Sequence, residues 1–377
     1  MKVEFLCYNA YGIGGTVRTV ISQANWLVRH GVDVTVVSMR RQAKAPRLPV
    51  DSLVVMTALV DYSGGHKHSA PETPSAIIHP DDDFFGVLNS ATDKALLHHL
   101  DTADADILVS TFPAMSIVLS VHRPPQAIVI AQEHKEYRLH SPQLQRDLVQ
   151  AYASLDCLVA LTETEAATYR QLLGPDVFVA VVPNAVELQD RSGMRDRRVI
   201  ITGGRLSEQK AFHKLVSAFA TIAEDLPDWE VRIYGSGDAI VRKALLSQID
   251  DLGLDGKVLL LPSSPRFFDE LARASIFAST STWESFGMII AEAMSVGVPT
   301  VAFETKGARQ LLSGGGGLVV EQDNVSAFGA ALRRLALSEE ERKRMGSVAR
   351  MHVARYSQDA VGVQWLQLFS QLRGRAQ

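Results

Sequence analysis

The sequence predicts an α/β protein with two successive Rossmann-like domains, each built on a parallel sheet. Short apolar runs typical of buried strands alternate with helical patterns along the whole chain. Polar turns that contain glycine follow several of these strands. The stretch 187–197 is polar and has no periodicity, so we expect a linker there. The 377 residues suffice for domains at 1–186 and 198–357, followed by a helical segment at 358–377.

Composition and charge exclude several classes of protein. Apolar residues make up 46% of the chain and charged residues 21%, which is typical of a soluble globular protein. A net charge of −4 gives no reason to expect a nucleic-acid partner. No apolar run reaches the ~18 residues of a membrane span, and the N-terminus reads as a first strand and not as a secretion signal. Cys7 and Cys157 lie in apolar runs and are expected to be buried free thiols, so we expect a cytoplasmic protein.

The first domain opens with a strand, a glycine-containing turn and an amphipathic helix at 16–30. Gly14 and Gly15 precede that helix and would let a ligand approach the backbone at its start. G-x-G-G is not the dinucleotide fingerprint, and a tight turn explains these glycines equally well. Further strands are predicted at 2–8, 32–38, 106–110, 127–132, 157–161 and 177–182.

Two charged stretches in the first domain allow more than one interpretation. Residues 40–47 carry four positive side chains, which form either a solvated loop or a contact for an anionic acceptor or a membrane surface. Asp81-Asp82-Asp83 lies in an irregular region, 61–86, and ends no strand. We therefore do not assign it to a metal site, and we expect none elsewhere.

A titratable cluster follows the strand at 127–132. It comprises Glu133, His134, Lys135, Glu136 and Arg138. Ligands of α/β sheets bind at the carboxyl ends of strands, so His134 is a candidate to contact substrate or a hydroxyl proton. A purely structural histidine is the equal alternative.

The second domain repeats the pattern, with strands at 198–202, 230–234, 257–261, 275–279 and 298–303. Arg205 and Lys210 lie between its first strand and first helix. A planar guanidinium and a point charge there suit a diphosphate, although basic residues more often mark a solvated surface.

The helix expected at 286–296 is framed by Glu284 and Glu292. Eight residues at ~100° each place the two carboxylates roughly 80° apart around the helix. The amides of Ser285, Phe286, Gly287 and Met288 are candidate first-turn donors for an anion. Phosphate at the helix start and carboxylates for hydroxyl groups would suit a nucleotide sugar. An amphipathic helix with two solvated glutamates is the plain alternative.

Two strings in this second domain carry a family resemblance. Glu-Ser-Phe-Gly-Met-x-x-x-Glu-Ala-Met-x-x-Gly-x-Pro-x-Val begins at Glu284, and Gly-Arg-Leu-x-x-x-Lys ends at Lys210. They resemble the signature of family-4 retaining glycosyltransferases with the GT-B fold. Pro183-Asn184-Ala185-Val186 and Gly235-Ser236-Gly237 are similar to further turns of that family. The chain departs from it at Ala211, where the family commonly has glycine, and the likeness is weak over 40–125, where acceptor specificity should lie.

The resemblance implies two Rossmann-like domains facing a cleft, with the helix at 358–377 packed back on the first domain. It also implies transfer of a sugar, with retention, from a nucleotide-diphosphate sugar to an acceptor hydroxyl in cell-surface polysaccharide, glycopolymer, glycolipid or natural-product synthesis. We expect UDP before GDP or ADP, no cofactor, and an acceptor that is anionic or borne by the inner face of the membrane, with peripheral contact. The implied catalytic set is His134, Arg205, Lys210 and Glu284. The implied donor site comprises Gly14, Gly15, Arg205, Lys210, Gly235, Ser264, Glu284, Ser285, Phe286, Gly287, Met288 and Glu292, with Glu133 and Arg138 toward the acceptor.

Three alternatives remain at this point. A sugar-nucleotide epimerase could use the same scaffold, but it would need catalytic carboxylates across the cleft. A pyridoxal-dependent phosphorylase would need a cofactor lysine, for which there is no sequence context. A catalytically silent nucleotide-sugar-binding protein could retain the same residues. An NAD oxidoreductase is disfavoured, because neither half has G-x-G-x-x-G with a downstream ribose-binding acid.

Overall fold

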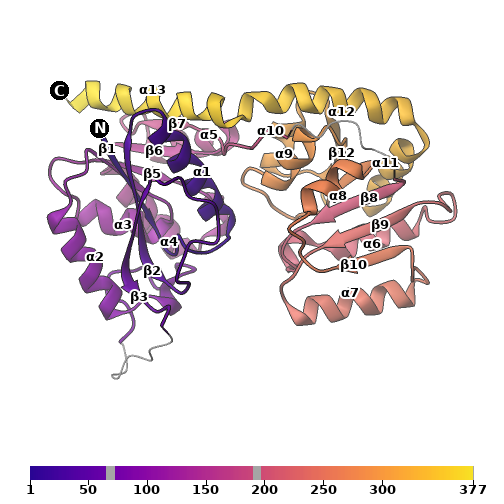
Figure 1. Ribbon diagram of the computed structural model, residues 1–377, viewed down its shortest axis with the longest axis horizontal. Helices are drawn as coiled ribbons and strands as arrows, with labels where there is room; N and C mark the ends of the chain where they lie inside the picture. Colours follow the sequence, from indigo (N-terminus) through magenta and orange to yellow (C-terminus); the bar gives the residue numbers. More distant parts are fainter. Residues whose placement is uncertain (65–72, 190–196, 377) are drawn as a thin grey trace. The chain divides into compact units, whose positions relative to one another are not determined.

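The computed structural model describes residues 1–64, 73–189 and 197–376, and it contains two compact α/β units (Figure 1). Unit 1 comprises Met1–Ala185 and Gln358–Gln377, and unit 2 comprises Val186–Ser357. Both are Rossmann-like, which confirms the predicted fold class. Of the expected linker 187–197, residues 190–196 lie outside the described part. Val186, where unit 2 begins, forms a parallel bridge with Ser357, where it ends.

Unit 1 is built on a seven-stranded parallel sheet in the order β3-β2-β1-β4-β5-β6-β7. Its strands are β1 (Lys2–Cys7), β2 (Asp33–Arg41), β3 (Val55–Asp61), β4 (Ile107–Ser110), β5 (Ile128–Gln132), β6 (Cys157–Ala160) and β7 (Val179–Val181). Its helices are α1 (Gly15–Arg29), α2 (Ser90–Thr102), α3 (Pro113–Val121), α4 (Pro142–Ala153), α5 (Glu163–Leu173) and α13 (Gln358–Ala376), with 3₁₀ turns η1 (Phe85–Val87) and η2 (Tyr137–Leu139). The inner strands β4, β5 and β6 are buried along their whole length, which explains why they are near-continuous apolar runs.

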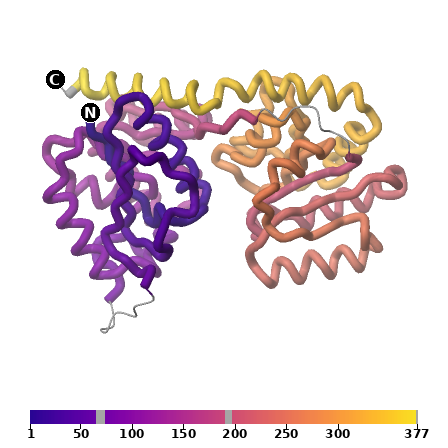
Figure 2. Tube along the Cα trace, viewed as in Figure 1, coloured from indigo at the N-terminus to yellow at the C-terminus, as the bar shows by residue number. Residues whose placement is uncertain are grey.

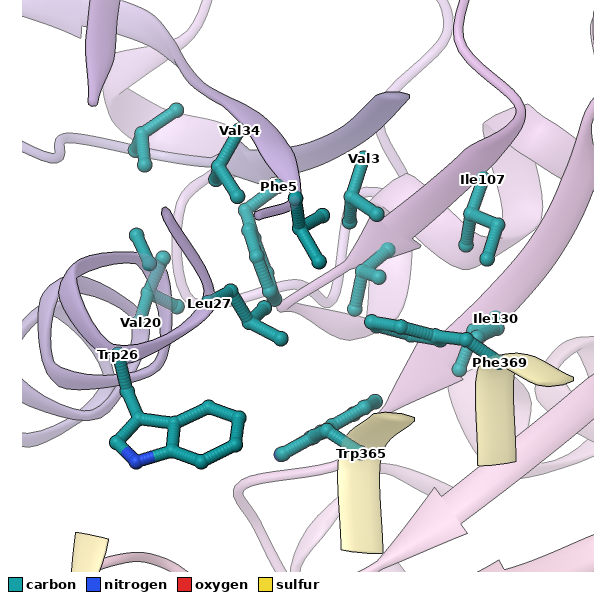
Figure 3. Packing of buried hydrophobic residues seen from close by; sticks show 14 of the residues in the cluster. Val3, Phe5, Val20, Trp26, Leu27, Val34, Ile107, Ile130, Trp365 and Phe369 are labelled. Atoms are coloured by element: carbon teal, nitrogen blue, oxygen red, sulfur yellow. The ribbon is translucent and has the colours of Figure 1, made fainter. Parts of the chain in front are cut away.

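The last helix, α13, completes the core of unit 1. Figure 2 shows the yellow C-terminal end of the chain beside the indigo N-terminal segment. Trp365 and Phe369 of α13 are fully buried and pack toward Phe5 of β1 (Figure 3). The absence of a side chain at Gly362 makes room for Trp26 of α1, because a Cβ there would lie 2.2 Å from the indole. Burial of each large apolar side chain contributes ~1.5–3 kcal/mol, so α13 belongs energetically to unit 1.

Unit 2 has a six-stranded parallel sheet in the order β10-β9-β8-β11-β12-β13. Its strands are β8 (Val199–Gly203), β9 (Glu230–Tyr234), β10 (Val258–Leu261), β11 (Ile276–Ser279), β12 (Thr300–Phe303) and β13 (Gly317–Val320). Its helices are α6 (Phe212–Ala220), α7 (Ala239–Asp251), α8 (Phe267–Arg273), α9 (Met288–Ser295), α10 (Lys306–Leu312), α11 (Val325–Leu337) and α12 (Glu339–Val353), with 3₁₀ turns η3 (Glu208–Lys210) and η4 (Ala354–Tyr356).

The strand orders locate the place where a ligand would bind in each unit. In an open parallel sheet, the crevice lies outside the carboxyl ends of the two strands at which the strand order reverses. Those strands are β1 and β4 in unit 1, and β8 and β11 in unit 2. The loops that carry Arg205, Lys210 and Glu284 follow β8 and β11 directly.

Several elements differ from the sequence prediction. β2 continues through Arg40 and Arg41, which therefore belong to the sheet and not to a solvated loop. β3 and α2 were not predicted, and α2 begins at a capping box formed by Asn89 and Thr92. α9 begins at Met288 and not at Phe286, because Gly287 adopts a left-handed conformation with φ +89°.

Both cysteines are free and buried, as predicted, and burial raises the pKa of each thiol to about 12. Among the described residues, no helix is both long enough and apolar enough to cross a membrane.

Candidate functional site

The loop after β8 brings Lys210 toward the reversal point of unit 2. Gly204 has a φ of +152°, which favours glycine, and a Cβ there would lie 3.1 Å from Cε of Lys210. Arg205 is exposed, and its guanidinium has no partner among the described residues. Ala211 takes the left-handed conformation (φ 44°, ψ 42°) that a glycine would adopt at lower cost. The chain therefore keeps the backbone conformation that suits glycine, although Ala211 replaces the glycine that is common in the family.

The loop after β11 supplies the partner of Lys210. Lys210 Nζ lies 2.5 Å from Glu284 Oε1, which also accepts a 2.8 Å hydrogen bond from Ser281 Oγ. Only 16% of the Lys210 side chain and 12% of the Glu284 side chain are exposed. Oε2 of Glu284 has no partner in the described part of the chain, so it can accept a hydrogen bond from a ligand.

These two loops are fastened to each other through backbone groups. The amide of Thr282 donates to the carbonyl of Gln209 at 2.8 Å, and Gln209 Nε2 donates to the carbonyl of Trp283 at 3.1 Å. Thr280 Oγ1 donates to the carbonyl of Lys210 at 2.9 Å. The ion pair therefore lies in a loop pair that is already held in place without a ligand.

The side chain of Gln322 also holds the Glu284 loop in place, and this role was not predicted from the sequence. Its Nε2 lies 3.0 Å from the carbonyl of Ser281, 3.3 Å from that of Thr282 and 2.9 Å from that of Glu304. Gln322 follows β13 in a polar turn that carries no recognisable motif. Only the folded structure brings its amide to the loop of Glu284.

The start of α9 offers unpaired donors close to that loop. The amides of Gly287, Met288 and Ile289 donate to no acceptor among the described residues. Ser285 Oγ is enclosed and also has no partner there. The amides of Ser285 and Phe286 likewise donate to no acceptor among the described residues, so the predicted donors at 285–288 are open and Ile289 adds one more. Glu292 is 7% exposed in the second turn of α9.

Three other predicted donor residues have structural explanations in unit 2. A Cβ at Gly235 would lie 2.1 Å from the carbonyl oxygen of Gly204, so this glycine lets the turn after β9 pack against the Arg205 loop. Ser264 follows β10, and its Oγ accepts a 3.1 Å hydrogen bond from the amide of Arg266. Phe286 is buried and packs edge-on against Tyr356 at 5.4 Å between ring centroids.

The polar cluster after β5 in unit 1 is largely internal. The hydroxyl of Tyr152 donates to Glu133 Oε1, and His140 Nε2 lies 3.9 Å from Glu133 Oε2. Burial raises the pKa of Glu133 to about 8, so this carboxyl is mainly protonated at neutral pH. We expected Glu133 to face an acceptor, whereas its side chain is buried and bonds to Tyr152 of α4.

His134 and Arg138 occupy the same loop differently. Nε2 of His134 is enclosed without a hydrogen-bond partner, and burial lowers the pKa of this imidazole to about 4. His134 is therefore a neutral group at physiological pH. The side chain of Arg138 is 62% exposed, and its Nε donates to Glu136 Oε2 at 2.9 Å.

The predicted glycines of unit 1 have no steric reason to be glycine. At Gly14 and Gly15, an added Cβ would meet nothing within 4 Å, and neither residue has a positive φ. Gly14 precedes α1 as its N-cap without a side-chain hydrogen bond. A ligand close to the start of α1 would explain both residues.

The aspartates at 81–83 each have protein partners. Asp81 accepts from Ser141 Oγ, Asp82 accepts from the amides of Phe84 and Ala114, and Asp83 pairs with Lys135. Within residues 1–64, 73–189 and 197–376, no group of three or more His, Cys, Asp or Glu side chains is arranged to hold a metal ion.

Comparison with known proteins agrees with this geometry. A family model described as Glycosyltransferase Family 4 matches residues 13–190, and one described as Glycosyl transferases group 1 matches residues 187–352. The chain belongs to the group 1 glycosyltransferases of family 4. The second model spans the loops of Arg205, Lys210 and Glu284, and the first spans those of Gly14, Gly15 and His134.

Two relatives of this glycosyltransferase chain have names that refer to polymers. An exopolysaccharide phosphotransferase of Streptomyces coelicolor is 30% identical over 395 aligned positions, which cover all of this chain and 41% of the relative. A poly(glycerol-phosphate) alpha-glucosyltransferase of Bacillus subtilis is 25% identical over 277 positions, which cover 70% of this chain and 41% of the relative. The chain thus spans about two-fifths of the length of each of these two relatives.

A solved structure confirms the GT-B fold. Mutant S. aureus TarM, in complex with fondaparinux, alpha-GlcNAc-glycerol and UDP, superposes with a TM-score of 0.79 at 14% identity. The superposition covers 98% of this chain and 100% of that chain. At this identity the likeness extends to the fold alone.

Proposed function

We propose that this glycosyltransferase moves a sugar, with retention of anomeric configuration, from a UDP-sugar to a hydroxyl group of a cell-surface glycopolymer acceptor. The observation that carries the proposal is the Lys210–Glu284 pair at the reversal point of unit 2, next to the unpaired amides at the start of α9. Cationic groups and free amides suit a diphosphate, and the open oxygen of Glu284 suits a sugar hydroxyl.

The chemistry required of the diphosphate site is stabilisation of the leaving group. As the bond between the anomeric carbon and the phosphate oxygen breaks, negative charge grows on the diphosphate. Arg205, Lys210 and the amides of Gly287, Met288 and Ile289 would gather that charge. Preorganised donors of this kind can each contribute ~3–4 kcal/mol to the transition state.

Retention is proposed through a reaction on one face of the sugar. The acceptor oxygen bonds to the anomeric carbon on the side from which the diphosphate departs. The acceptor proton passes to the departing phosphate oxygen, so no protein base is needed at that step. In this scheme Glu284 holds donor-sugar hydroxyls, and Glu292 accepts from the ribose. His134, which is neutral, orients the sugar or the acceptor.

UDP is proposed as the nucleotide because TarM, which has the same fold, was solved with UDP. GDP and ADP are the alternatives. The names of the two relatives favour an anionic polymer or a membrane-borne precursor as acceptor, which would place the enzyme in the cytoplasm near the inner membrane face. We also propose that neither a metal nor a cofactor is required.

The test is turnover of a panel of UDP-, GDP-, ADP- and dTDP-sugars with EDTA present, with and without glycerol-phosphate oligomers as acceptor. Transfer from one nucleotide family, with an anomeric proton in the product that matches the donor by NMR, is the expected result. Formation of the epimer of the nucleotide sugar without an acceptor would indicate an epimerase instead. Nucleotide binding without any turnover would indicate a silent binding protein.

A further inference from the structure

A second group of side chains in unit 1 has chemistry that the donor site does not use. It lies at the carboxyl ends of β1, β2 and β3, and we refer to it as the arginine–tyrosine cluster: Tyr8, Tyr11, Arg40, Arg41 and Tyr62. The amide of Arg40 donates to the carbonyl of Tyr8 at 3.2 Å, so the residues that follow β1 and end β2 are in register. This edge includes β1, one of the two strands at the reversal point of unit 1.

The two arginines of the cluster differ in how their charge is balanced. Arg41 pairs with Asp61 and lies over the ring of Tyr11, with its Cζ 5.6 Å from the ring centroid. Arg40 lies over the ring of Tyr62 at 4.5 Å and donates to the carbonyl oxygen of Val87 at 2.5 Å. Arg40 has no carboxylate partner among the described residues. The cluster therefore contains one positive charge that the described part of the protein leaves uncompensated.

Tyr8 provides a hydroxyl beside that charge. Its ring stacks on Phe84, with 4.1 Å between centroids and 7° between planes, and Phe84 packs edge-on against Phe112. This packing fixes the ring, and the hydroxyl has no hydrogen-bond partner in the described part of the chain. Burial raises the pKa of Tyr8, although the neighbouring charge of Arg40 opposes the rise, so the hydroxyl stays protonated and can donate.

We propose that Arg40 and Tyr8 form a binding subsite for a phosphate group carried by the acceptor. Arg40 Nη1 donates to Val87 and its Nε is enclosed, so Nη2 is the guanidinium nitrogen that can donate to a phosphate oxygen. The hydroxyl of Tyr8 adds a second donor. Lys44 and Arg47 are exposed further along the same segment, and they raise the positive potential nearby. That the phosphate belongs to the acceptor rests on the proposed function, whereas the subsite itself does not.

Binding of sn-glycerol 3-phosphate and of inorganic phosphate, measured by titration calorimetry, tests this subsite. The titrations use an Arg205→Ala/Lys210→Ala background, in which the proposed diphosphate site is disabled. Arg40→Gln should weaken glycerol phosphate at least about tenfold, because hydrogen bonds to a charged group are lost. Arg40→Lys, which keeps the charge and loses the guanidinium, should weaken glycerol phosphate less than Arg40→Gln does. Arg146→Gln, an exposed arginine of α4, is the matched control and should change little.

Each outcome of these titrations either supports the subsite or overturns it. Unchanged binding in Arg40→Gln would overturn the proposal, as would an equal loss in Arg146→Gln. If Arg40→Gln does not fold, Arg40→Lys and Tyr8→Phe decide instead, and wild-type affinity in both would overturn it. Arg40-dependent binding to vesicles of phosphatidylglycerol without binding of soluble glycerol phosphate would assign the cluster to the membrane and also overturn it. The Arg205→Ala/Lys210→Ala background lacks both cations of the proposed diphosphate site. These titrations therefore give the same answer whether or not the wild type binds a nucleotide.

Discussion

Lys210 Nζ lies 2.5 Å from Glu284 Oε1, and this pair joins the loops that follow the two strands where the sheet of unit 2 reverses its order. Both side chains are mostly enclosed, so each charge depends on the other for compensation. The pair holds Lys210 at the proposed diphosphate site, and it leaves one oxygen of Glu284 open. It thus links the stability of the loops to the proposed chemistry.

Removal of Lys210 should cost both stability and catalysis. In Lys210→Ala, Glu284 is left as an enclosed charge without its partner, and the free energy of unfolding should fall by about 3 kcal/mol. Urea denaturation of Lys210→Ala, Glu284→Gln and the double variant measures the coupling. The double variant should recover part of the loss, because the uncompensated charge is gone. Stability losses that simply add would show that the two groups are not coupled.

Gln322 should act as a positioning residue for the Glu284 loop. Gln322→Leu removes the donor shared by the three carbonyls, so kcat/KM for the donor should fall about tenfold, a loss of about 1.4 kcal/mol in transition-state stabilisation. Gln248→Leu is the control, because Gln248 also donates to two groups of unit 2, the carbonyl of His213 and Ser217 Oγ. The control should lower the Tm to a similar degree while kcat/KM stays near wild type. Equal activity losses in both variants would leave Gln322 with a structural role only.

Glu133 should make the stability of unit 1 depend on pH. Burial raises the pKa of this carboxyl from its ordinary 4.5 to about 8 in the folded protein. Its contribution is therefore fully present below pH 4.5 and is lost as pH rises toward 8, at up to about 1.4 kcal/mol per pH unit. In melting curves from pH 5 to 9, the Tm of Glu133→Gln should rise relative to that of the wild type until about pH 8. Parallel curves would mean that Glu133 is not buried as a neutral acid.

Replacement of glycine by alanine should have opposite effects on stability at two positions. A Cβ at Gly307 would lie 2.2 Å from the carbonyl oxygen of Phe286, and the turn before α9 would have to move. Gly307→Ala should lower stability by about 1–3 kcal/mol, as overpacking does, and weaken UDP binding. Gly15→Ala meets nothing within 4 Å and should keep or raise the Tm. If Gly15 lies against a ligand, its variant loses activity without losing stability, whereas full activity would contradict that role.

Much of the fold could be predicted because the hydrophobic period of a segment and the residues that end helices and strands are local signals. Alternating apolar runs and helical patterns located most strands, and they placed the start of α9 within two residues of its observed position. Lys210 and Glu284 could both be assigned to the donor site because each belongs to a string of fixed spacing. Their contact, across 74 positions of sequence, needed the strand order.

The parts that were not predicted depend on tertiary contacts. β2 reaches Arg41 because Arg40 and Arg41 pair with β3, and no strand was predicted at Val55–Asp61 although its residues are mostly apolar. Glu133 turns inward because its partner, Tyr152, lies on α4 and not in the same loop. Gln322 donates to backbone carbonyls, and no residue spacing encodes such a bond. The roles of the individual site residues stay predictions until they are measured.

The most direct test of the central claim is calorimetric titration of UDP into the wild type and Arg205→Ala, with EDTA present. Arg344→Ala, an exposed arginine of α12, is the matched control. If the reversal point of unit 2 binds the diphosphate, Arg205→Ala should weaken UDP at least about tenfold, or 1.4 kcal/mol, and Arg344→Ala should bind like the wild type. Equal affinity in Arg205→Ala and the wild type, or no binding of UDP to either, would contradict the assignment of this site.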